Sequence, residues 1–189
     1  MIINNYELSG NIDSREIYNL VQKIINQEFI SNQIINQVLE INQGQNQKQA
    51  EPFLGNQDSD IKMNFYGNFS RPESSGIARI LYEIQKNYPN QTVLYFRNFP
   101  ENENDFLVAE AMECSLYFEK FWEYYDWNFV YGKNFTEDEL VENAQKIGIN
   151  SRKFRKCLDE NIFQQEVLYD LSEAKNLNLK KSPAVCINT

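Results

Sequence analysis

The chain offers few of the residues that usually carry nucleophilic, redox or metal chemistry. It has three cysteines, Cys114, Cys157 and Cys186, and no histidine. No two of them form a Cys-x-x-Cys pair, the spacing that exchanges disulfides at a helix start. The absence of histidine excludes Cys/His zinc sites and histidine-based triads. We therefore expect no metal site, no cofactor and no conventional catalytic residue.

Two short peptides have the form of loops that face each other at a functional site. Residues 68–74 (NFSRPES) follow a predicted strand and place four residues at the start of a helix: Arg71, Pro72, Glu73 and Ser74. The second peptide is Ser182-Pro183, which leads into the apolar run 184–187. A proline in that position is typical of a strand reached through a cis peptide bond.

The start of this helix has two interpretations. Ser70 and Glu73 have capping-box spacing, and Pro72 costs little in a first turn because no amide hydrogen is needed there. A plain helix start is the simpler interpretation. In the alternative, Arg71 or Ser74 contacts an anionic ligand at the helix N-terminus.

The apolar pattern predicts an α/β fold. Strands are expected at residues 61–66 and 92–96, with a helix over 74–88 between them, which makes a βαβ unit with two parallel strands. Thr136 with Glu139 predicts a further helix start, and Gly148 the end of that helix. Helices are expected over 105–118, 136–147, 151–158 and 163–177. The aromatic block 121–129 is expected to be core, the alternative being that it lines a cofactor or hydrophobic-peptide groove.

The first part of the chain, residues 1–51, is predicted to be a separate helical extension with a linker. Amphipathic helices are expected to begin near Ser14 and Ser31, before the polar stretch 42–49. Helices this short are marginal alone. We expect them to pack on the rest of the chain, or else to mediate self-association or docking on another subunit.

Six segments, in order and spacing, resemble DsbA-like thiol:disulfide oxidoreductases. They are residues 54–60 (LGNQDSD), 93–100 (VLYFRNFP), 109–114 (AEAMEC), 120–126 (KFWEYYD), 154–158 (FRKCL) and 182–183 (SP). The resemblance implies a thioredoxin-like fold over residues 52–189 with a large helical insertion at about 104–160. It also implies an extracytoplasmic location, in a periplasm or equivalent lumen, and the N-terminal extension resembles the oligomerising extensions of some periplasmic members.

The chain departs from this family in two places. Where the family has Cys-x-x-Cys, the chain has Arg71-Pro-Glu-Ser74, so dithiol exchange is excluded there. After the proline-led strand the family has a further strand and a closing helix, whereas only three residues follow Cys186 here. We expect the C-terminal part of the sheet to be incomplete. Either the chain is truncated or a partner completes the sheet along its exposed edge.

The resemblance implies a structural role for two of the cysteines. Cys114 and Cys157 lie where some DsbA-like proteins have a second, structural disulfide, which predicts that they pair; the alternative is two buried free thiols. Cys186 is expected to be a small core residue, the alternative being a lone reactive thiol.

The net charge of −9 and the lack of any Lys/Arg block argue against nucleic-acid or anionic-membrane partners, and no apolar run is long enough to span a bilayer. We expect a soluble, non-catalytic thioredoxin-fold protein that serves as a protein-binding or structural subunit, with Ser182 and Pro183 as the wall of a peptide groove. The alternatives are a thiol-disulfide oxidoreductase or isomerase that uses Cys186 or the Cys114 and Cys157 pair, and a peptide-binding chaperone.

Overall fold

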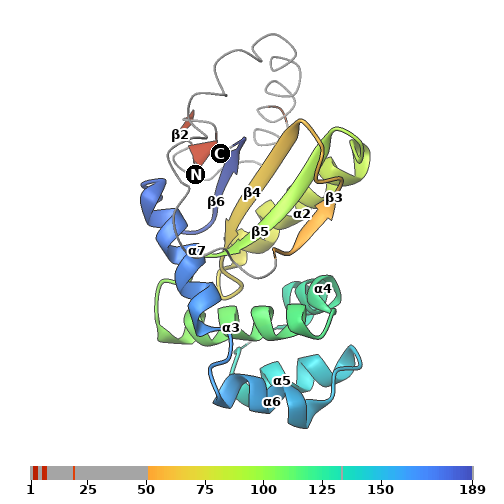
Figure 1. Ribbon diagram of the computed structural model, residues 1–189, viewed down its shortest axis with the longest axis vertical. Helices are drawn as coiled ribbons and strands as arrows, with labels where there is room; N and C mark the ends of the chain where they lie inside the picture. Colours follow the sequence, from red (N-terminus) through yellow and green to blue (C-terminus); the bar gives the residue numbers. More distant parts are fainter. Residues whose placement is uncertain (1, 4–5, 8–18, 20–50, 133, 189) are drawn as a thin grey trace.

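The computed structural model describes residues 2–3, 6–7, 19, 51–132 and 134–188 (Figure 1). The helices predicted near Ser14 and Ser31 and the polar stretch 42–49 lie outside the described residues. Their structure, and the division of the chain at residue 51, therefore stay predictions.

A four-stranded sheet forms the centre of the described chain, in the order β3-β5-β4-β6. β4 and β5 run parallel, while β3 is antiparallel to β5 and β6 is antiparallel to β4. The strands are β3 (Phe53–Gly55), β4 (Ile61–Gly67), β5 (Thr92–Asn98) and β6 (Ala184–Ile187). The predicted βαβ unit is confirmed, because helix α2 (Pro72–Asn87) connects the two parallel strands.

β6 lies at one edge of this sheet. All four of its residues are buried, and among the described residues it pairs with β4 alone. The short strands β1 (Ile2–Ile3) and β2 (Tyr6–Glu7) pair with each other, and β1 lies close to β6 (Figure 1).

Most of the remaining described residues are helical. α3 (Glu103–Tyr117), α4 (Phe121–Tyr131), α5 (Glu137–Lys146) and α6 (Ser151–Asp159) gather at one end of the sheet, and α7 (Gln164–Asn176) leads back toward β6 (Figure 1). The predicted helices are confirmed to within two residues at each end. Thr136 accepts a hydrogen bond from the Glu139 amide, and Gly148 has φ of +90°. The predicted N-cap of α5 and the predicted glycine after its C-terminus are therefore both present.

The plain helix start with Pro72 in its first turn is confirmed, but the predicted cap of α2 was wrong. The helix begins at Pro72, two residues before the predicted position, and its N-cap is Arg71, whose side chain makes no capping hydrogen bond. The expected capping box of Ser70 and Glu73 is absent, and the Ser70 hydroxyl has no hydrogen-bond partner. The physical reason is that Arg71 adopts an extended conformation, after which the fixed φ of Pro72 suits the first helical residue.

The main core lies between the sheet and the helices, and aromatic rings fill much of it. Phe96 of β5 and Tyr125 of α4 stand edge to face at 5.6 Å between ring centroids. Phe69, in the loop after β4, packs on both rings at 5.3 and 5.2 Å. A disulfide between Cys114 and Cys157 joins α3 to α6, as the resemblance implied.

A partly buried ion cluster holds α7 against β5. Arg97 of β5 pairs with Glu173 at 3.2 Å, lies 3.9 Å from Asp170 and also pairs with Glu51. Asp170 accepts a hydrogen bond from the Asn98 amide at 2.7 Å. Burial alone lowers the pKa of Arg97, but the surrounding carboxylates outweigh it and raise the pKa. The guanidinium therefore stays charged and holds α7 against the sheet.

Within the described part of the chain, no helix is both long enough and apolar enough to cross a membrane.

Candidate functional site

The loop before α2 and the loop before β6 meet at the carboxyl end of the parallel strands. A single carboxylate, that of Glu101 just after β5, joins them. Its Oε2 forms an ion pair with Nη2 of Arg71. Its Oε1 accepts hydrogen bonds from both the backbone amide and the hydroxyl of Ser182, at 2.8 and 2.9 Å. The two peptides singled out in the sequence are therefore linked through a third residue.

The bond between Ser182 and Pro183 is cis, as the sequence pattern predicts. Ser182 is 2% exposed, and both of its donors are taken by Glu101. A peptide that approached this proline would have to compete with an intramolecular acceptor for the Ser182 amide.

A second layer of polar groups holds the loops in place. Asp105 of α3 accepts hydrogen bonds from the Asn68 side chain at 2.7 Å and from the Glu101 amide at 3.1 Å. The Asn68 amide in turn donates to the Ser74 hydroxyl at 3.1 Å. Ser74 is fully buried, so its hydroxyl supports the loop, and the alternative in which it contacts a ligand is not favoured.

The site carries ionic and hydrogen-bonding groups but no thiol. Residues 71–74 contain no cysteine. Cys186 lies three residues after Pro183 in β6 and is 5% exposed. In the described residues, no group of three His, Cys, Asp or Glu side chains is arranged to hold a metal ion. The chemistry available from this arrangement is the binding of polar or charged groups.

A sequence model of the family described as thioredoxin matches residues 47–189. The chain belongs to the thioredoxin family. None of the curated proteins matches it closely enough to count as a relative.

Solved structures extend the comparison of this thioredoxin-family chain. BdbD from Bacillus subtilis, in its oxidised form, superposes with a TM-score of 0.68 at 21% identity and covers 73% of this chain and 81% of its own. The thiol-disulfide exchange protein α-DsbA2 from Wolbachia pipientis superposes with a TM-score of 0.66 at 14% identity, and the match covers 95% of this chain and 90% of α-DsbA2. DsbA from Chlamydia trachomatis gives 0.65 at 14% identity, covering 75% and 83%. At these identities the likeness shows a shared DsbA-like thioredoxin fold, and not a shared activity.

The sequence identified the two loops of the site in this thioredoxin-family protein, residues 71–74 and 182–183, but gave no local indication of Glu101 and Asp105, which connect them. The signal for both was topological. The carboxyl ends of parallel strands meet at one edge of a sheet, where α/β folds place their sites. Polar residues that follow β5 were therefore candidates for contact with the loop that follows β4.

Proposed function

We propose that this thioredoxin-family protein is non-catalytic and serves as a protein-binding or structural subunit of a larger assembly. The observation that carries the proposal is the position of Glu101. Its carboxylate ties Arg71, at the start of α2, to Ser182, beside the cis-proline. Exchange of disulfides at this place requires a thiolate and a second thiol, whereas this tie is an ion pair and two hydrogen bonds.

The three cysteines elsewhere in the chain support the same proposal. Cys114 and Cys157 are bonded to each other and are 1% and 3% exposed, and Cys186 is 5% exposed. An attacking thiolate must reach the sulfur of its substrate. Burial hinders that approach at all three positions.

The partner proposed for this subunit is a protein. The net charge of −9 disfavours polyanions. The surfaces proposed for docking or self-association are the residues before Glu51 and the edge of the sheet at β6, since a strand edge can pair with another chain. A partner at that edge would have to share it with β1, which lies close to β6. By analogy with the extracytoplasmic members of the DsbA-like group, a periplasm or an equivalent lumen is the proposed location.

Insulin reduction and refolding of a scrambled disulfide substrate test the absence of redox activity. The proteins to compare are the wild type, Cys186→Ser and the double variant Cys114→Ser, Cys157→Ser. We expect no turnover above the buffer rate for any of them. Turnover by the wild type that one of these changes abolishes would overturn the proposal in favour of an oxidoreductase.

That second candidate is favoured by the structural neighbour α-DsbA2 from Wolbachia pipientis, a thiol-disulfide exchange protein. A third candidate is a peptide-binding chaperone, in which Ser182 and Pro183 would form the wall of a peptide groove. Saturable binding of an extended peptide that Pro183→Ala weakens would support this third function. Native mass spectrometry of the protein from its own source tests the subunit role, since a lone 22.4 kDa species would contradict it.

A further inference from the structure

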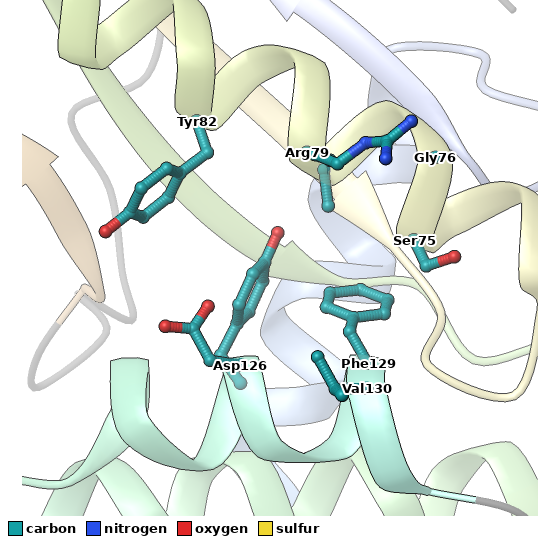
Figure 2. Close-up of a pocket in the computed structure, with 9 residues that line it drawn as sticks. Ser75, Gly76, Arg79, Tyr82, Asp126, Phe129 and Val130 are labelled. Atoms are coloured by element: carbon teal, nitrogen blue, oxygen red, sulfur yellow. The ribbon is translucent and has the colours of Figure 1, made fainter.

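A pocket of about 440 Å³ lies between α2 and α4 (Figure 2). α2 contributes one wall, from Ser75 to Tyr82, and α4 contributes the other, from Tyr125 to Val130. The volume falls in the range usual for small-molecule sites. The sequence offered a cofactor or hydrophobic-peptide groove as an alternative role for the aromatic block 121–129, which forms most of the α4 wall. The proposed function uses no such place, and the pocket is separate from the tie made by Glu101.

The hydroxyl of Tyr125 is an unpartnered polar group in this pocket. Tyr125 is 3% exposed, and its buried hydroxyl has no hydrogen-bond partner. Phe69 and Phe129 pack edge to face against its ring at 5.2 and 4.6 Å. Its electrostatic neighbours are Asp126 and Tyr82, and all three residues line the pocket.

The pocket is also charged unevenly. The Asp126 carboxylate lies at the end beneath Tyr82, whereas the Arg79 guanidinium extends toward Gly76, at the other end (Figure 2). Asp126 forms no ion pair with a described residue. Partial burial raises the pKa of Asp126, and the nearby Glu123 raises it further. Asp126 is exposed, so this end of the pocket presents a carboxylate to a ligand.

The walls between these ends are apolar. Ala78 forms part of the α2 side and is 1% exposed. Phe129 and Val130 lie opposite, on α4 (Figure 2). An aromatic or branched aliphatic body would bury its surface here, and a cation held near the faces of Tyr82 and Tyr125 would gain further attraction from their rings.

We propose that this pocket binds a small organic amine, with the apolar body of the ligand between Ala78 and Phe129 and its ammonium group donating to the Asp126 carboxylate and the Tyr125 hydroxyl. An anion at the same place would meet Asp126 unfavourably, and a neutral ligand would leave the carboxylate unpaired. Among the described residues, two helices line the cavity, and it has the size of one compact molecule, which favours a small ligand over a polypeptide segment.

The test uses phenethylamine as the probe, with 2-phenylethanol and phenylacetate as neutral and anionic counterparts of similar shape. The full chain is titrated by NMR chemical-shift perturbation and by calorimetry. We expect saturable binding of the amine with a dissociation constant on the order of 1 mM. The alcohol should bind at least about tenfold more weakly, and the acid should not saturate, because only the amine pairs with a carboxylate.

Four variants locate the binding. Asp126→Asn should weaken the amine about tenfold and Tyr125→Phe about fivefold, since charged hydrogen bonds are the stronger ones. Val130→Trp, at a position that is 68% exposed, should block the pocket and abolish binding without disturbing the core. Glu142→Gln removes a charge from an exposed position on α5 and should change nothing.

Three results would overturn the proposal. They are the absence of saturable amine binding at 10 mM probe, equal binding of all three probes, and amine binding that Asp126→Asn and Val130→Trp leave unchanged. Thermal unfolding of each variant confirms that it is folded before it is titrated.

Discussion

Glu101 shows how one side chain can connect two distant loops. Its ion pair with Arg71 is partly solvated, since the Arg71 side chain is 40% exposed and the Glu101 side chain 25% exposed. Ion pairs of that kind contribute little to stability. Its two hydrogen bonds come from Ser182, which is 2% exposed. Hydrogen bonds to a charged acceptor in such buried surroundings contribute more to the free energy of unfolding. Most of the stabilisation by Glu101 therefore comes from its Ser182 side.

Replacing each partner tests this division. Glu101→Gln should lower the free energy of unfolding by about 1–2 kcal/mol, because the charged acceptor for the Ser182 amide and hydroxyl is lost. Arg71→Gln should lower it by less than about 1 kcal/mol. Urea unfolding measures both, with Glu83→Gln as a control at an exposed position of the same helix. A larger loss for Arg71→Gln than for Glu101→Gln would contradict the division.

Glu110 of α3 provides a pH-dependent test. It is 5% exposed, its Oε1 has no hydrogen-bond partner, and burial raises its pKa above the ordinary 4.5. A raised pKa in the folded state means that stability is highest with the carboxyl protonated, below pH 4.5, and falls as the pH rises through the folded-state pKa.

Glu110→Gln, which is neutral at every pH, should therefore melt at a higher temperature than the wild type at pH 7. At pH 4 the two proteins should melt at nearly the same temperature. Differential scanning calorimetry at the two pH values measures the difference, and an equal difference at both would exclude the carboxyl group as its cause.

At the scale of elements, local signals predicted most of the fold. The strand that became β5 has the β-branched and aromatic run Thr92-Val-Leu-Tyr-Phe96, and α5 has its cap and its glycine stop. The tie at the site could not be predicted in the same way. Glu101 and Ser182 are 81 residues apart in the chain, and only the topology of the sheet brings them together.

The aromatic block illustrates the same limit. Its helical spacing correctly predicted core positions, and Phe121, Tyr124 and Tyr125 are buried. The pocket beside Tyr125 depends on how α2 and α4 lie relative to each other. That placement is a tertiary property, and the sequence of α4 alone carries no signal for it.

The N-cap of α5 can be tested at this scale. Thr136→Ala removes the hydroxyl that accepts from the Glu139 amide at 3.3 Å and should lower the free energy of unfolding by about 1 kcal/mol. Thr136→Ser keeps an acceptor in the same place and should recover most of that loss. Chemical denaturation compares the three proteins, and equal losses for both variants would show that the methyl group, and not the cap, is responsible.

At the scale of the whole molecule, covalent and ionic links hold the helical part and the sheet together. The disulfide closes a loop with a sequence separation of 43 residues between α3 and α6. The Arg97 cluster connects β5 to α7, and Asp105 connects α3 to the loop after β4. The position of the site loops thus depends on groups in three helices outside them.

Removing the disulfide should be the most costly of these changes. In the chain-entropy account, the double variant Cys114→Ala, Cys157→Ala loses up to about 4 kcal/mol of unfolding free energy. A reductant should destabilise the wild type and have no effect on this variant. Cys186→Ser serves as the control, because it keeps the bridge and should remain sensitive to the reductant. If the reductant also destabilised the double variant, the stabilisation could not be assigned to the Cys114–Cys157 disulfide.

The position of Glu101 also bears on any attempt to give the protein a redox centre. Arg71→Cys with Ser74→Cys would place two sulfurs at the start of α2, but the carboxylate that now pairs with Arg71 would remain beside the first of them. A neighbouring negative charge raises the pKa of a thiol and depletes the nucleophilic thiolate. A designer would therefore have to neutralise position 101 as well, and would in doing so release the loop before β6.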